Sequence, residues 1–188
     1  MANKMEIALL EGAKLRQDTA KACMKDMEFA LTLLVKSYKS GGKMILCGNG
    51  GSAADSQHIA AEMVGKFNRD RRAFPALALS TDTSVLTAVG NDFGFEHVFE
   101  RQIEANGNKG DVLIAITTSG NSKNILLAAK IAKRMGIQVV GLTGNTGGAL
   151  KSLSDVCICV PSDLTPRIQE LHIAIGHILC GELEAALL

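Results

Sequence analysis

The chain alternates between short apolar runs and longer amphipathic stretches. The apolar runs at 43–47, 76–80, 112–117, 138–143 and 156–160 are typical of strands that are buried on both faces of a sheet. Stretches with helical spacing lie between them, and the expected helices are 52–66, 96–105, 121–135, 148–152 and about 167–187. This alternation predicts a doubly wound α/β fold, in which a five-stranded parallel sheet is flanked by helices on both faces.

A long helical segment is expected before the first strand. Apolar residues between Cys23 and Tyr38 recur every three or four positions, which is the spacing of one helix face, and Gly41-Gly42 end the pattern. No repeat, low-complexity tract or linker interrupts the chain. Because 188 residues is an ordinary length for one domain, residues 1–188 are expected to form a single domain.

The composition argues against several classes of partner. Twenty basic and nineteen acidic side chains leave a net charge of +1, so no bulk attraction to nucleic acid or to an anionic membrane is expected. With no Trp and one Tyr, base-stacking platforms are not expected. No apolar run is long enough to span a membrane, and Glu6 and Glu11 interrupt the N-terminal segment. We therefore expect a cytoplasmic protein with no membrane partner.

The five cysteines show no metal-binding spacing. They are odd in number, and no CxxC pair occurs among them. Cys157 and Cys159 lie two apart in the last apolar run, so on a strand they share a face. We interpret all five as reduced packing residues, which suits a reducing compartment.

The sequence CGNGGS, residues 47–52, leads from the first strand directly into a helix. Its glycines allow close approach of a ligand to the backbone, Ser52 is the expected N-cap, and the helix N-terminus favours an anion. A tight turn without ligand is the simpler alternative. The motif also fits the GxGxxG/A pattern of dinucleotide sites, but the acidic residue expected about 20 positions later is absent, since Asp82 lies more than 30 positions on.

The sequence TTSGNS, residues 117–122, places four hydroxyl groups at the end of another strand and just before a helix. We call these six residues the hydroxyl loop. A phosphate monoester favours several convergent donors at a positive helix end, and needs no cation there. A helix cap without ligand remains the alternative. GxxxxGK[ST] is absent, which argues against a nucleoside triphosphate. Loops at the carboxyl ends of parallel strands converge, so we expect the site to form between the loops after the first three strands. These loops are 47–52, 80–84 and 117–122.

Two helices carry polar residues suited to proton transfer or metal binding. His58 and Glu62 lie four apart and share one helix face, and the last helix carries Gln169 and His177. Gln169 and His177 are eight residues apart, about 12 Å along the axis. Both reach one metal only if they lean together or come from different subunits. Each of these four polar residues could instead be an ordinary surface residue. We interpret the other two histidines, His97 and His172, as structural residues. We interpret the basic stretch after the helix as a solvated loop, which contains Lys66, Arg69, Arg71 and Arg72.

Five blocks in order carry a resemblance to a known family. CGNGGSAADSQHIAAE, VGNDFGF, TTSGNS, LTGNTGG and RIQELHI resemble the blocks of the sugar isomerase (SIS) domain family and, within it, of the phosphoheptose isomerases. The resemblance implies a homotetramer with active sites between subunits. It also implies interconversion of sedoheptulose 7-phosphate and D-glycero-D-manno-heptose 7-phosphate through an enediol, for bacterial heptose in lipopolysaccharide or another surface polysaccharide.

The resemblance also implies roles for individual residues. It implies one zinc per subunit, held by His58, Glu62, Gln169 and His177, and an acid/base pair formed by Glu62 and His177. The substrate contacts that it implies are Asn49, Gly50, Gly51, Ser52, Glu62, Asn91, Asp92, Thr117, Thr118, Ser119, Ser122 and Gln169.

Two alternative functions remain open at this point. Some relatives bind the bacterial replication initiator and lack isomerase chemistry, but they lose the acid/base residues that Glu62 and His177 supply here. Other members isomerise a different sugar phosphate. Sequence separates these poorly, because substrate length is set by the shape of the loops.

Overall fold

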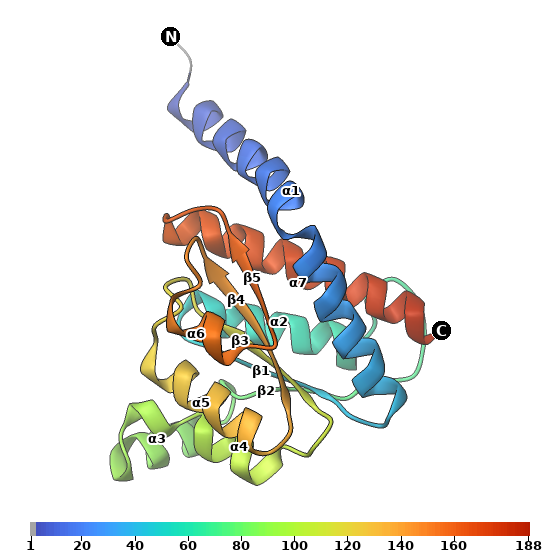
Figure 1. Cartoon of the computed structure of the whole chain (residues 1–188), viewed down its shortest axis with the longest axis vertical. Helices are drawn as coiled ribbons and strands as arrows, with labels where there is room; N and C mark the ends of the chain where they lie inside the picture. Colours follow the sequence, from blue (N-terminus) through green and yellow to red (C-terminus); the bar gives the residue numbers. More distant parts are fainter. Residues whose placement is uncertain (1–2) are drawn as a thin grey trace.

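The computed structural model describes residues 3–188 and contains one five-stranded parallel sheet (Figure 1). The strands are β1 (Met44–Gly48), β2 (Ala76–Ala78), β3 (Val112–Ile116), β4 (Gln138–Gly144) and β5 (Val156–Val160), in the order β2-β1-β3-β4-β5. The chain order reverses between β1 and β3. In sheets of this kind ligands bind at that switch point, beyond the carboxyl ends of the strands.

Helices cover both faces of the sheet, as the sequence predicts. One face is covered by α1 (Lys4–Lys39), α2 (Gly51–Val64) and α7 (Thr165–Leu187). The other face carries α3 (Thr83–Asp92), the 3-10 helix η1 (Phe95–His97), α4 (Glu100–Asn106), α5 (Lys123–Arg134) and α6 (Gly148–Leu153). The two helices that matter most for the site, α2 and α7, therefore lie on the same side of the sheet.

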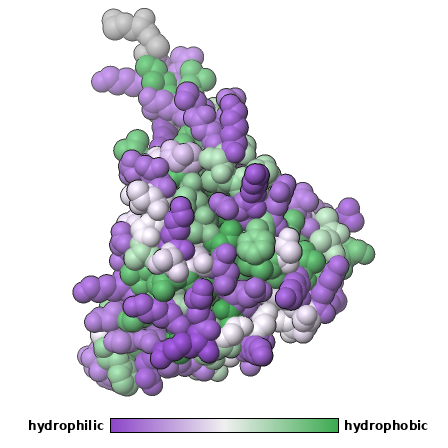
Figure 2. Space-filling model, in the orientation of Figure 1, coloured by the Kyte–Doolittle hydropathy of each residue, from purple (hydrophilic) through white to green (hydrophobic). Residues whose placement is uncertain are grey.

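Helix α1 extends beyond the body of the molecule (Figure 1). Its buried residues begin only at Thr19, whereas Met5, Leu9 and Leu10 near its start are 72%, 75% and 62% exposed. Hydrophobic and hydrophilic side chains are mixed on this projecting part (Figure 2). Across residues 3–188, none of the helices combines the length and the apolar composition needed to cross a membrane.

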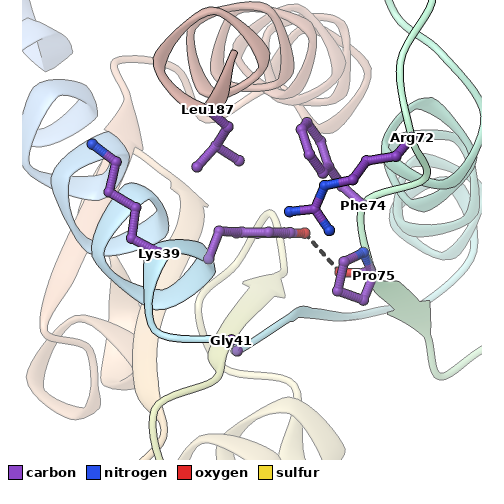
Figure 3. Close-up of a pocket in the computed structure, with 8 residues that line it drawn as sticks. Lys39, Gly41, Arg72, Phe74, Pro75 and Leu187 are labelled. Carbon is purple, nitrogen blue, oxygen red and sulfur yellow. Dashed lines mark hydrogen bonds between the residues drawn. The ribbon is translucent and has the colours of Figure 1, made fainter.

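A cavity of about 350 Å³ lies at the edge of the sheet where β1 and β2 begin (Figure 3). Tyr38, Arg72 and Phe74 line it, and the Tyr38 hydroxyl donates a hydrogen bond of 2.7 Å to the Pro75 carbonyl. The switch point lies on the opposite side of the sheet, at the carboxyl ends of the strands. This cavity is therefore separate from the loops in which the sequence predicts ligand binding.

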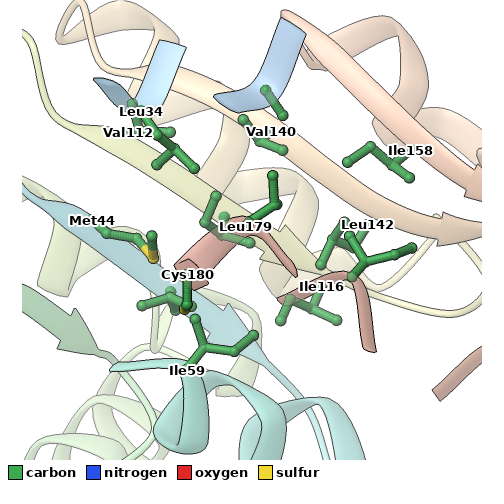
Figure 4. Packing of buried hydrophobic residues seen from close by; sticks show 14 of the residues in the cluster. Leu34, Met44, Ile59, Val112, Ile116, Val140, Leu142, Ile158, Leu179 and Cys180 are labelled. Carbon is green, nitrogen blue, oxygen red and sulfur yellow. The ribbon is translucent and has the colours of Figure 1, made fainter. Parts of the chain in front are cut away.

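The strands are buried on both faces because their side chains alternate between two apolar clusters. In β3, Val112, Ile114 and Ile116 pack under α1, α2 and α7, and Leu113 and Ala115 pack toward α4, α5 and α6. Figure 4 shows the first cluster, in which residues of α2 and α7 meet side chains from β1, β3, β4 and β5. This packing confirms that the uninterrupted apolar runs are strands of a parallel sheet rather than helix segments.

Three local predictions are wrong. Helix α3 was not expected, although the Asp82 side chain caps it by accepting a hydrogen bond of 2.9 Å from the Val85 N–H. The helix expected at 96–105 is instead η1 followed by α4. Ser52 is not an N-cap, because α2 begins one residue earlier with Gly50 as its cap, and Ser52 lies buried in the first turn.

Candidate active site

A cavity of about 280 Å³ lies at the switch point, between the loops that follow β1 and β3 and the start of α7. Its lining includes every predicted substrate contact except Glu62, Asn91 and Asp92. The residues that line it are Asn49, Gly50, Gly51, Ser52, Ile116, Thr117, Thr118, Ser119, Ser122, Thr165 and Gln169. We call it the switch-point cavity.

The hydroxyl loop is ordered by hydrogen bonds among its own groups. Thr117 Oγ1 lies 3.0 Å from Ser122 Oγ and 3.4 Å from Ser119 Oγ, and Ser119 Oγ accepts a hydrogen bond from the Asn121 N–H. Helices α2 and α5 both begin at this cavity, so their N-termini face it. None of the residues that line the cavity is charged. Helix N-termini and hydroxyl groups favour an anion without a cationic side chain.

Helix α7 contributes Gln169 to this cavity because Gly51 has no side chain. A Cβ atom on Gly51 would lie 2.5 Å from the Gln169 amide nitrogen and 2.9 Å from its Cδ. Any larger residue at position 51 would therefore displace the amide. The absence of a side chain thus allows α7 to lie directly against the first turn of α2.

His58, Glu62 and His177 form a second polar group, which we call the His/Glu triad. His58 Nε2 lies 3.1 Å from Glu62 Oε1 and 3.2 Å from His177 Nε2, and the three potential ligand atoms all lie within 4.8 Å of one another. One ring proton cannot satisfy both close contacts of His58 Nε2. Two imidazole nitrogens and a carboxylate oxygen that converge in this way fit a divalent metal, and are ligands that zinc prefers.

The triad forms within one chain because α2 and α7 pack closely next to it. A Cβ atom on Gly176 would lie 2.5 Å from Cδ1 and 2.8 Å from Cγ1 of Ile59. Gly176 and Ile59 directly adjoin His177 and His58 in sequence, so this contact brings the two imidazole rings to a centroid separation of 4.9 Å. The Phe67 ring also packs against the His177 ring, with a centroid separation of 5.7 Å.

A buried ion pair fixes the segment between α2 and β2 on α7. Arg71 Nε donates to Glu184 Oε1 at 2.8 Å, and the two side chains are only 1% and 2% exposed. Glu184 also accepts hydrogen bonds from the N–H groups of Phe67, Asn68 and Arg69. The prediction of a solvated basic loop is therefore wrong at Arg71, because its charge is paired inside the protein.

The same guanidinium also caps the end of α2. Arg71 donates to the carbonyl groups of Glu62, Met63 and Gly65. Burial opposes ionisation of Glu184, but the Asn68 N–H and the Arg71 guanidinium outweigh it and lower the pKa of this carboxyl group. The network holds the end of α2 that carries Glu62 against the helix that carries His177.

Asp55 is a residue of the site that the sequence analysis does not single out. It lies one turn before His58 on α2, and its Oδ2 atom is buried without a hydrogen-bond partner. Burial raises the pKa of this carboxyl group, and the nearby His58 and His177 oppose the rise. The helical spacing of Asp55, His58 and Glu62 is a signal from which all three could have been grouped.

Several predicted site residues lie apart from the triad. Asn91 and Asp92 are exposed at the end of α3 and do not line the switch-point cavity. Gln169 lines that cavity, about 12 Å along α7 from His177. Ser80, in the loop after β2, contacts Gln57 and Ala53 of α2 rather than the cavity. His172 is fully buried, and burial lowers its pKa to about 4, as expected for a residue with a structural role.

Comparison with known proteins places this arrangement in a class. A family model described as a SIS domain matches residues 11–144. The phosphoheptose isomerase of Nitratiruptor sp. is 52% identical over 185 residues, covering 96% of this chain and 97% of that protein. The phosphoheptose isomerase of Aneurinibacillus thermoaerophilus is 56% identical over 161 residues, covering 86% of this chain and 81% of that protein.

A solved structure gives the same result for the fold. The phosphoheptose isomerase of Neisseria gonorrhoeae aligns with a TM-score of 0.91 at 42% identity, covering 97% of each chain. The chain belongs to the SIS domain family and, within it, to the phosphoheptose isomerases. This confirms the resemblance that the five sequence blocks carry.

The triad should bind a divalent metal through both of its helices. Replacing His177 by alanine removes one of three converging ligand atoms, so we expect the Kd for Zn²⁺ to rise at least about tenfold. Equilibrium dialysis with Zn²⁺ alone measures this. His97→Ala is the matched control, because His97 pairs with Glu100 outside the triad and its loss should leave the Kd unchanged. Equal Zn²⁺ affinity in the His177→Ala and wild-type proteins would contradict the assignment.

Proposed function

We propose that this protein is an aldose-ketose isomerase that interconverts sedoheptulose 7-phosphate and D-glycero-D-manno-heptose 7-phosphate. The observation that carries the proposal is that α2 and α7 each run from the switch-point cavity to the His/Glu triad. Along α2, His58 and Glu62 lie about 9 and 15 Å beyond Ser52, at 1.5 Å per residue. A seven-carbon chain with phosphate at one end suits a site with an anion pocket and proton-transfer groups separated in this way.

In the proposed mechanism the switch-point cavity holds the phosphate group. The hydroxyl groups of Thr117, Ser119 and Ser122 and the N-termini of α2 and α5 supply donors and positive potential. Gln169 faces the same cavity and is available to a substrate hydroxyl group. Binding at this end fixes where the reacting carbons lie, which lowers the entropic part of the barrier.

Glu62 and His177 carry the proton in this mechanism. Isomerisation removes a proton from C1 of the ketose while the C2 carbonyl oxygen is protonated, which gives an enediol. Return of a proton to C2 and loss of the O1 proton then give the aldose. One carboxylate and one imidazole at the same end of the substrate supply the base and the acid that both halves require.

The residues present also fit the zinc ion that the resemblance implies. His58, Glu62 and His177 would hold it. Gln169 of a neighbouring subunit is proposed as the further ligand, because within one chain Gln169 lies about 12 Å along α7 from His177. When bound, zinc polarises carbonyl and hydroxyl oxygens as a Lewis acid. The proton transfer itself remains with the side chains of Glu62 and His177.

The remaining assignments follow from the same family. We propose a single-domain cytoplasmic enzyme that assembles as a homotetramer with active sites between subunits and supplies heptose for surface polysaccharide. The exposed apolar residues Met5, Leu9 and Leu10 on α1 support assembly, because a second copy would cover them. Asn91 and Asp92, which lie outside the switch-point cavity, are proposed to contact substrate across such an interface. A non-catalytic binding module is disfavoured, because the acid/base pair is present and converges.

Turnover should depend on the Glu62 carboxylate. Glu62→Gln keeps the shape of the side chain and removes its basicity, so we expect kcat to fall by about a hundred- to ten-thousand-fold. Formation of the aldose phosphate from sedoheptulose 7-phosphate measures this, and the Kd for inorganic phosphate should change by less than about twofold. Glu104→Gln, exposed on α4, is the control and should retain activity. A Glu62→Gln enzyme with wild-type kcat would refute the role.

Substrate affinity should depend on the hydroxyl loop. Ser119→Ala removes a donor at the proposed phosphate site, so we expect KM to rise about tenfold with little change in kcat. Steady-state kinetics with sedoheptulose 7-phosphate separate the two constants. Ser152→Ala is the control, since this exposed hydroxyl on α6 donates only to the Ala149 carbonyl. An unchanged KM in Ser119→Ala would place the phosphate elsewhere.

A further inference from the structure

Strand β5 carries a pair of cysteines that the isomerase mechanism does not use. Cys157 and Cys159 project from the same face of the strand, and their Sγ atoms are 3.7 Å apart. The Thr143 hydroxyl on the neighbouring strand lies 3.5 Å from the first sulfur and 3.3 Å from the second. The face that carries these sulfurs lies against α6 rather than against the switch-point cavity.

The two thiols differ in exposure and in acidity. Cys157 is 8% exposed, whereas Cys159 is only partly buried. Hydrogen bonding with the Cys157 side chain favours the Cys159 thiolate, and the Thr143 hydroxyl, which donates to Cys159 Sγ, and Lys151 add to this effect. Together they outweigh burial and lower the pKa of Cys159 below its usual range.

The remaining cysteines are less reactive by the same criteria. Burial raises the pKa of Cys23 to about 11 and that of Cys180 to about 12, and it also raises the pKa of the fully buried Cys47. A thiolate is the nucleophile in thiol oxidation, and oxidation-sensitive cysteines are accessible thiolates with a second thiol nearby. Only the pair on β5 meets both conditions within residues 3–188.

We propose that Cys157 and Cys159 form a peroxide-sensitive dithiol that closes reversibly to an intramolecular disulfide. The Cys159 thiolate attacks one oxygen of hydrogen peroxide, the O–O bond breaks, and hydroxide leaves to give a sulfenic acid on Cys159. The Cys157 sulfur then attacks the Cys159 sulfur, and water leaves with the thiol proton. The two sulfurs lose two electrons in total, and the peroxide takes them up.

Closure of this disulfide should disturb the hydroxyl loop. Residues two apart on a strand have Cα atoms about 6.6 Å apart, near the upper end of the range that disulfides span, so closure must bend β5. Cys159 Sγ lies close to Gly147, the N-cap residue of α6, because a Cβ atom on Gly147 would lie 3.1 Å from this sulfur. From α6, the Leu150 N–H donates to the Gly120 carbonyl and the Ala149 N–H donates to Asn121 Oδ1.

This coupling rests on the proposed function, since the hydroxyl loop is the proposed phosphate site. We expect the disulfide form to show a KM for sedoheptulose 7-phosphate raised by about threefold or more, restored by dithiothreitol. Formation of the disulfide is measured without substrate, so its failure is distinct from a failure of the isomerase assignment.

The test compares thiol counts and masses after brief treatment with hydrogen peroxide. We expect the unfolded wild-type chain to titrate five thiols before oxidation and about three after it, with a mass loss of about 2 Da that dithiothreitol reverses. Peptide mapping should place the bond between Cys157 and Cys159, and this measurement needs no variant. Cys180→Ser is the matched control and should still lose two thiols.

Two serine variants separate the roles of the pair. Cys159→Ser should keep its four thiols under the same treatment. Cys157→Ser should form no disulfide and should instead give a dimedone adduct on Cys159, because the sulfenic acid has no partner. The proposal is overturned if the wild-type pair reacts no faster than Cys47, if the mapped disulfide joins other cysteines, or if Cys159→Ser still loses 2 Da.

Discussion

The close packing of α2 against α7 is the constraint on which the site depends. Gly176 leaves room for Ile59 and Gly51 leaves room for Gln169, so the two helices touch near both ends of the site. These contacts place Gln169 in the switch-point cavity and His177 beside His58 and Glu62. The buried Arg71–Glu184 pair then fixes the segment that leaves α2 on the same helix. The two glycines therefore allow α2 and α7 to pack closely, and the buried ion pair beside them holds the helices in the arrangement that forms both halves of the site.

The two halves stabilise charge by different means. The switch-point cavity has no charged lining residue, and it relies on helix N-termini and hydroxyl groups, which suit a dianion that must also be released. The His/Glu triad concentrates titratable and metal-binding groups at one point. A sugar phosphate carries its charge at one end and its reactive carbonyl group at the other, so this division matches the chemistry of such a substrate.

Much of the fold follows from the sequence because buried parallel strands leave a strong local signal. The five apolar runs correspond to the five strands, and the glycine and hydroxyl motifs lie at the switch point as expected. Helix α3 is missed because its apolar pattern is short and depends on one capping residue, Asp82. The alternation of strands and helices, together with the two loop motifs, is therefore enough to predict the position of the switch-point cavity.

Tertiary contacts account for what the sequence could not predict. His58 and Glu62 are grouped by helical spacing, but His177 joins them only through the packing at Gly176. Arg71 is read as solvated because its partner, Glu184, is 113 residues away in the chain. Sequence spacing leaves open whether Gln169 and His177 of one chain can reach the same metal. In the structure His177 joins His58 and Glu62, whereas Gln169 lies in the switch-point cavity.

The turnover number of a Gly176→Ala enzyme tests this account most directly. Its added methyl group meets Ile59 and should separate α2 from α7 by a few tenths of an ångström or more, while Glu62 and His177 both remain. We predict that kcat falls about ten- to a hundredfold in a protein that is still folded, and that adding Ile59→Ala restores most of the loss by making room. Wild-type kcat in Gly176→Ala, with the helices intact by circular dichroism, would contradict the claim that this contact assembles the site.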